Sequence, residues 1–316
     1  GGPGQGEGRR RTDLAPSIGD LAMVASVLRV GCPMWAHPPW VGRFLSAGHR
    51  GRELVEYARW CNAVEGNTTF YAVPAARTVA RWAEQAPADF RFAFKLPRHI
   101  THELRLRGDA AAAALVEFLE AIEPLGERVG PLQLQLPPSF GPDMLAVLRS
   151  FLGRLPRSHR WVVELRHPGF FDGGAAHRAV DEVVGTAGVG RVVLDTRPLY
   201  ASSPMSDAAV DERRTKPRLP VLTDMMGSYP IVRLIGSDDV EGTAEGLRAW
   251  IPQLAEWISQ GREPYVYVHQ PENLESPALA RMIHAEVAEV VDGLAPLPTP
   301  LPIAPASEVV GQDSLF

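Results

Sequence analysis

The chain has 316 residues, of which 45% are hydrophobic and 22% charged, an ordinary composition for one large globular domain or two smaller ones. Its net charge of -5 gives no global signal for a nucleic-acid partner or an anionic membrane surface, so any basic site must be local. No apolar run approaches the roughly 20 residues of a membrane-spanning helix, which predicts no membrane partner. Two cysteines, Cys32 and Cys61, are too few for a four-cysteine metal site and fit buried thiols in a reducing cytoplasm.

Along the chain, a Gly- and Arg-rich start predicts a disordered or lead-in segment over 1–27. Short β-rich runs then alternate with longer helical runs, which indicates one α/β domain over 28–293. The predicted strands are 28–32, 63–66, 91–96, 132–136, 161–165, 191–195, 231–235 and 265–269. Helical patterns occupy 51–61, 76–85, 111–122, 145–153, 245–259 and 278–291.

Eight such strand units predict a closed TIM-like (β/α)8 barrel. An open doubly wound sheet would need a glycine-rich phosphate loop after the first strand, and GCPMWAHPPW is not one. Residues 197–228 lack periodicity and predict a long polar loop over one mouth of the barrel. The Pro-rich tail, 294–316, reads as a stiff tether that ends in QDSLF.

Polar residues end nearly every predicted strand, where barrels of this kind build their active sites. Any one of them fits a buried ion pair as well as a catalytic role, but several acids and bases on one rim would shift each other's pKa values, as general acid–base chemistry requires. We expect the catalytic groups among Glu65, Lys95, His102, Glu164, His167 and Asp195. Ligand-binding candidates are Asn67, Thr69, Arg98, Gln135, Arg166, Arg233, His269 and Asn273. Four of these side chains are predicted to converge on one pocket: Glu65, Lys95, Glu164 and Arg233.

Several segments together resemble the signature blocks of the YecE-like family, the domain of unknown function 72. They are VGCPMW (30–35), VEGNTTFYAVP (64–74), FRFAFKLPRHITH (90–102), PLGERVGPLQLQLPPSF (124–140), VVELRHPGFF (162–171) and VHQPEN (268–273). The resemblance covers about 28–293 and implies a TIM-like barrel, distantly similar to the xylose-isomerase and endonuclease-IV barrels, with no settled activity. Many relatives carry Asn-Asn where this chain has His269-Gln270, and the 197–228 insert is its own, so substrate specificity does not carry over.

A divalent metal is one option, because the related endonuclease barrels hold zinc with His, Glu and Asp. No motif such as H-E-x-x-H ties the acidic and histidine residues together, so we assign no metal ligands and no cofactor. A site for an anion needs no such motif. Basic side chains are enough, and four of them are suited to bind a phosphate oxygen: Lys95, Arg98, Arg166 and Arg233.

Three functions therefore stay open. The first is an enzyme, such as a hydrolase, or a binder of a phosphate-bearing or nucleic-acid ligand at the carboxyl-terminal mouth of the barrel. The second is a carbohydrate-active isomerase or hydrolase. The third is a non-catalytic adaptor recruited to the sliding clamp, because Gln312, Leu315 and Phe316 resemble the pentapeptide with which bacterial replication proteins dock on that clamp.

Overall fold

The computed structural model describes residues 27–224 and 227–300, and the strands within them are all parallel. They are β1 (Arg29–Gly31), β2 (Ala63–Gly66), β3 (Arg91–Phe94), β4 (Leu132–Gln135), β5 (Trp161–Glu164), β6 (Gly190–Asp195), β7 (Ile231–Ile235) and β8 (Tyr265–His269). Nearly every strand residue is buried, as expected where helices cover a parallel sheet. Each predicted strand is present, within two residues of its predicted ends.

The prediction of a closed eight-stranded barrel is wrong. Within the described residues the strands form two hydrogen-bonded sheets, one of six strands in the order β1-β8-β7-β6-β5-β4 and one of β2 and β3. The ladder is interrupted at two seams, between β1 and β2 and between β3 and β4. The strand pattern gives the number of strands but not whether each pair of neighbours shares a ladder.

At the first seam, side chains take the place of backbone pairing. The Tyr57 hydroxyl accepts from the Cys32 backbone N–H at 2.8 Å and donates to the Ala63 carbonyl at 2.9 Å. The Asn62 side chain makes two further hydrogen bonds to the backbone of Leu28 and Val30. These contacts satisfy the edge of β1, so a continuous ladder to β2 is not needed.

At the second seam, a change of register interrupts the ladder. Phe92 pairs with Val129 and Lys95 with Gln133 as isolated bridges. The two bridges lie three residues apart on the β3 side and four on the β4 side. The extra residue prevents regular pairing, as in a bulge.

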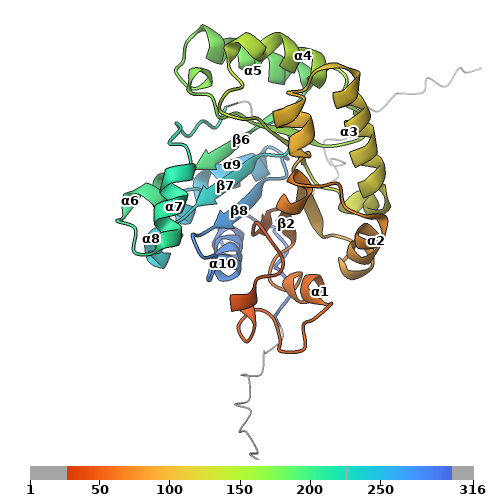
Figure 1. Cartoon of the computed structure of the whole chain (residues 1–316). Helices are drawn as coiled ribbons and strands as arrows, with labels where there is room; N and C mark the ends of the chain where they lie inside the picture. Colours follow the sequence, from red (N-terminus) through yellow and green to blue (C-terminus); the bar gives the residue numbers. More distant parts are fainter. Residues whose placement is uncertain (1–26, 225–226, 301–316) are drawn as a thin grey trace, which may run out of the picture.

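Helices surround the strands, with α2 and α3 on one side and α6, α7 and α8 on the opposite side (Figure 1). They are α1 (Glu53–Tyr57), α2 (Ala76–Gln85), α3 (Gly108–Ile122), α4 (Leu145–Leu152), α5 (Ala175–Ala187), α6 (Arg197–Ala201), α7 (Asp207–Thr215), α8 (Val240–Arg248), α9 (Ile251–Ser259) and α10 (Ser276–Ala288). The predicted helix over 245–259 is two helices, because Pro252 in the first turn of α9 cannot continue the hydrogen bonds of α8.

The insert over 197–228 differs from the predicted loop, since it contains α6 and α7. The Ser206 hydroxyl accepts from the Ala209 N–H and caps α7. The helix itself, DAAVDERRT, buries only Ala209 and so carries almost no amphipathic signal.

The packed part of the chain reaches into the Pro-rich segment, because Leu294 and Leu297 are buried against the main hydrophobic core. Both cysteines are buried and free, as predicted. Among the described residues no helix combines the length and apolarity needed to cross a bilayer. The predictions for residues 1–26 and for the QDSLF terminus lie outside the described residues, and the cytoplasmic location stays a prediction.

A candidate active site at the carboxyl ends of the strands

The candidate site forms as a polar layer directly above an apolar one. Successive side chains on a strand alternate between faces, so residues two apart point the same way. On five strands an apolar inward residue is followed two positions later by a polar one: Ala63 and Glu65, Ala93 and Lys95, Val162 and Glu164, Ile231 and Arg233, Tyr267 and His269. The apolar members form one buried cluster, and each polar member lies two positions closer to the carboxyl end of its strand or just beyond that end.

Arg233 joins the two carboxylates of this layer. Its Nε and Nη2 donate to Glu65 at 2.5 and 3.1 Å, and its Nη1 donates to Glu164 at 2.8 Å. All three side chains are buried, with Arg233 2% exposed. Burial alone would lower the pKa of Arg233, but Glu65 and Glu164 outweigh it and raise this pKa above its ordinary value. Arg233 therefore stays charged, and each of its three nitrogens donates to a carboxylate.

Glu164 accepts three hydrogen bonds, as many as Glu65 does. Besides Arg233, it accepts from Arg166 Nε and from Gln133 Nε2, both at 2.6 Å. Burial raises the pKa of Glu164, but the nearby cations Arg166, Arg233 and Lys95 have the larger, opposite effect. The resulting pKa is about 2. In Glu65, burial is likewise outweighed by Arg233 and Lys95, so its pKa is well below the ordinary value. Both carboxylates are ionised at neutral pH.

Lys95 directly follows β3 and is only 6% exposed. Its Nζ lies 3.9 Å from Glu65 Oε2, an ion-pair distance that is too long for a hydrogen bond. Burial, and then the neighbouring Arg233, lower the pKa of Lys95 to about 7, against the opposing pull of Glu65 and Glu164. A substantial fraction of Lys95 is therefore an uncharged amine at neutral pH.

Several polar atoms around this cluster are sealed from solvent and have no hydrogen-bond partner. They are Asn67 Oδ1, Gln135 Oε1, Tyr267 Oη and His269 Nε2. His269 Nε2 lies 3.2 Å from Glu65 Oε2, within ion-pair distance but without hydrogen-bond geometry. Burial lowers the pKa of His269 to about 4, so its ring is neutral at neutral pH. Unsatisfied buried polar atoms are uncommon in folded proteins, and four of the seven among the described residues lie around this cluster.

The structure thus brings together Glu65, Asn67, Lys95, Glu164, Arg166, Arg233 and His269, which with Gln133 we call the polar network. Gln135 lies at the same end of β4, paired in register with Glu164.

Other predicted site residues have local structural roles. The Thr69 hydroxyl bonds to the carbonyls of Gly66 and Lys95 and fastens β2 to β3. His167 Nδ1 accepts from the Gly169 N–H and caps a short helix. Asn273 has a positive φ of 52° and its side chain accepts from the Gln270 N–H, which makes it a turn residue. Polar residues after strands often serve the loop backbone in this way.

Three further predicted residues lie outside the polar network. Asp195 accepts from Arg197 and from Trp250 Nε1 at 2.8 Å, a separate buried cluster. Arg98 pairs with Glu103 at 3.5 Å, and its side chain is 52% exposed. The pKa of His102 is lowered by burial and then by Arg166 and Arg98, so this half-buried ring is a neighbour of the network without bonding to it.

The residues considered for a divalent metal do not gather. Among the described residues, no group of three or more His, Cys, Asp or Glu side chains is placed to hold a metal ion. His167 and Asp195 are engaged elsewhere, and the carboxylates of the network face cations.

Sequence reasoning missed three contributors. Gln133 bonds to Glu164, and Tyr267 pairs in register with Arg233 beneath His269. Their two-residue spacing from Gln135 and His269 was the available signal. Lys216 lies in the insert, and its charge contributes to lowering the pKa of His269. The sequence feature that could have pointed to Lys216 is the rarity of lysine, because Lys95 and Lys216 are the two lysines of the chain.

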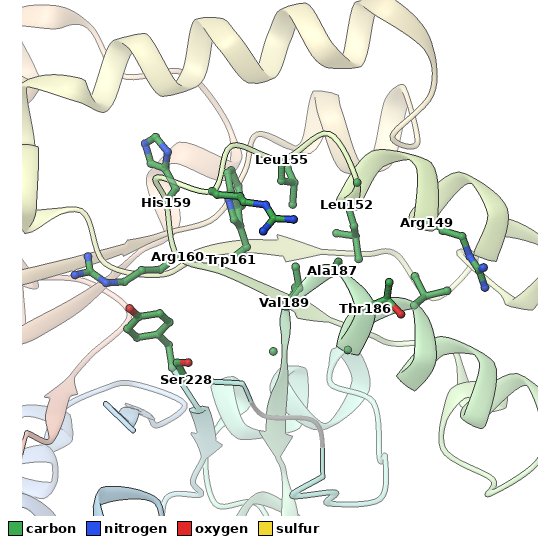
Figure 2. A pocket seen from close by; sticks show the side chains of 17 residues that line it. Arg149, Leu152, Leu155, His159, Arg160, Trp161, Thr186, Ala187, Val189 and Ser228 are labelled. Carbon is green, nitrogen blue, oxygen red and sulfur yellow. The ribbon is translucent and has the colours of Figure 1, made fainter. Parts of the chain in front are cut away.

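A separate cavity of about 470 Å³ lies at the opposite end of the strands (Figure 2). Its lining includes Trp161 and Gly190, the first residues of β5 and β6, together with Arg149, His159 and Arg160. None of the predicted site residues lines it. In folds with parallel strands, catalytic groups belong to the carboxyl ends, so we place the candidate site at the polar network.

Fold and site define a parallel α/β protein with an ionised acid–base cluster at the carboxyl ends of its strands. Residues 29–302 match the family described as protein of unknown function DUF72, to which the chain belongs. It is 38% identical over 272 residues to the UPF0759 protein YecE of Escherichia coli K12, covering 86% of this chain and 97% of that protein. The YecE protein of Escherichia coli O157:H7 matches with the same identity and coverage.

Two solved structures of DUF72 family proteins share the fold. The protein from Thermotoga maritima MSB8 has a TM-score of 0.59 at 22% identity, covering 81% of this chain and 99% of its own. The protein from Enterococcus faecalis V583 has a TM-score of 0.57 at 18% identity, covering 83% and 96%. At these identities the likeness concerns the fold alone.

Proposed function

We propose that the polar network is the active site of an enzyme that performs proton-transfer chemistry on a small anionic substrate, such as one that carries a phosphate. The observation that carries this proposal is the buried Lys95 amine, held beside two carboxylates that share one guanidinium. A cluster built only for stability would gain little from a buried amine with a pKa of about 7.

The proton-transfer roles follow from the protonation states. Glu65 and Glu164 are ionised at neutral pH, because the pKa of each is lowered. Lys95 titrates near neutrality and can take or give a proton during a reaction. Arg233 fixes the distance between the carboxylates and donates to them from each of its three nitrogens, so its role is positioning.

Arg166 is the group best suited to receive the anion. Its Nε is bound to Glu164, but among the described residues its two terminal nitrogens have no hydrogen-bond partner. Its side chain is 17% exposed, and neither terminal nitrogen is among the sealed, unpartnered atoms of the described residues. Arginine with free terminal nitrogens is suited to a bidentate contact with phosphate.

The alternatives fit less well. Glycoside hydrolysis needs one carboxylic acid that stays protonated, whereas both carboxylates here are ionised. Clamp recruitment, and with it the nucleic-acid form of the function, depends on Gln312, Leu315 and Phe316, which lie outside the described residues.

The test is the melting temperature in phosphate against chloride at matched ionic strength. Phosphate strengthens folding generally, so the informative quantity is the difference between variants. Phosphate should raise the melting temperature of the wild-type protein and of Arg248→Ala, an exposed control, by the same amount, and that of Arg166→Gln by less. Equal gains in all three proteins would contradict anion binding at Arg166.

A further inference from the structure

The chain uses arginine almost wherever it needs a cation. Of its 32 basic residues, Lys95 and Lys216 are lysines and the rest are arginines. Arginine pairs with carboxylates at least as well as lysine does, but it cannot release its proton in a protein. A lysine at the centre of the polar network therefore supplies what arginine cannot, which is an amine with a free electron pair.

The surroundings of Lys95 suit a reacting amine. Among the described residues its one polar contact is the 3.9 Å ion pair with Glu65, so none of them forms a hydrogen bond with the nitrogen. The Lys95 Nζ is not among the polar atoms of the described residues that are sealed from solvent without a hydrogen-bond partner. By contrast, three nearby polar atoms are sealed and have no partner there: Asn67 Oδ1, Gln135 Oε1 and His269 Nε2. The amine thus keeps an open side, next to polar groups that lack partners.

We propose that Lys95 is the nucleophile of this site and forms an imine with the carbonyl carbon of an aldehyde or ketone that also carries a phosphate. This inference rests on the proposed function and names its substrate class. Arg166 would hold the phosphate and Glu65 would move protons, while Lys95 makes the covalent bond.

The step is balanced without an oxidant or a reductant. The Lys95 nitrogen attacks the carbonyl carbon, so a C–N bond forms and the carbonyl π bond becomes a C–OH bond. Glu65 accepts a proton from the nitrogen and returns it to the hydroxyl group. The carbonyl oxygen then leaves as water with two hydrogens that came from the amine, and a C=N bond remains.

The experiment treats the full-length protein with glyceraldehyde 3-phosphate and sodium cyanoborohydride at neutral pH. The hydride reduces any imine to a stable secondary amine, which peptide mass mapping locates. Because the chain has two lysines and one amino terminus, every site of reaction can be assigned. Glyceraldehyde without phosphate is the matched probe, and Lys95→Arg and Glu65→Gln are the variants.

Lys95 should be labelled at least about tenfold faster than Lys216, since Lys216 is ion-paired with Glu212 at 3.2 Å whereas no described residue forms a hydrogen bond with the Lys95 nitrogen. Removing the phosphate from the probe, or Glu65→Gln, should slow labelling of Lys95 alone, and Lys95→Arg should abolish it. Equal labelling of Lys95 and Lys216 would overturn the inference. If the Arg166-dependent gain in melting temperature persists in that case, the proposed function stands; if it is also absent, both proposals fail.

Discussion

Arg233 is the residue on which the two buried carboxylates depend. A buried charge that loses its partner is costly, and this guanidinium serves Glu65 and Glu164 together. The same contacts link protonation to folding. In the folded protein the pKa of Glu164 is about 2. This carboxylate therefore stabilises the fold at pH values above the ordinary pKa of a glutamate, and the stabilisation is lost as the pH falls toward 2.

Arg233→Met should lower the free energy of unfolding at pH 7 by about 3–5 kcal/mol, because two buried carboxylates lose the guanidinium that they share. The loss should shrink as the pH is lowered and the carboxyl groups of the variant become protonated. Urea denaturation across a pH series measures both effects, with Arg248→Met, in an exposed ion pair, as a control that stays close to wild type. A loss independent of pH would mean that Arg233 acts through packing rather than charge.

Residue types and strand position were enough to predict that Glu65, Lys95, Glu164 and Arg233 lie together, because each ends or nearly ends a predicted strand. The same reasoning could not separate His167 and Asn273 from them. Both follow strands, but they serve the backbone of their own loops, and a single sequence does not reveal which backbone groups need a partner.

At the scale of elements, the seam between β1 and β2 depends on close approach. A Cβ at Gly31 would lie 2.1 Å from the Ala63 carbonyl oxygen and 3.0 Å from the Tyr57 hydroxyl. The Tyr57 hydroxyl bridges the two strands only because Gly31 has no side chain there. This geometry also explains why counting strands predicted a closed barrel: the pattern of residues is the same whether neighbours pair through backbone or through side chains.

Gly31→Ala should therefore cost on the order of 3 kcal/mol or more in unfolding free energy, since neither the backbone oxygen nor the buried ring can move freely. Gly48→Ala is the matched control, because a Cβ there would meet nothing within 4 Å. Denaturant midpoints of the two variants measure the difference. Equal midpoints would show that the seam adjusts and that close packing does not maintain it.

The helices of the insert show a different limit of sequence reasoning. Helix α7 buries a single residue, Ala209, and its other apolar side chains, such as Val210, are not buried. Its order comes from the Ser206 cap and from contacts such as Asp238 with the Met205 and Ser206 N–H groups. Those contacts join residues more than thirty positions apart, so a local pattern could not predict them.

Across the whole molecule, the two ends of the strands differ in chemistry. The amino ends of β5 and β6 border an open cavity lined largely by loop and helix residues (Figure 2). The carboxyl ends hold the polar network, with its shared arginine and its buried amine. The proposed chemistry depends on that amine being free of its proton at neutral pH.

The most direct measurement is an NMR titration of the protein labelled with ¹³Cε-lysine, because two lysines give a spectrum that Lys95→Arg assigns at once. We predict that the Lys95 signal titrates with a midpoint near pH 7, since burial and Arg233 disfavour its charged form. In Arg233→Met the midpoint should move upward, because a neighbouring positive charge is removed while Glu65 and Glu164 remain. A Lys95 signal that stays protonated up to pH 9 or above in the wild-type protein would contradict the account.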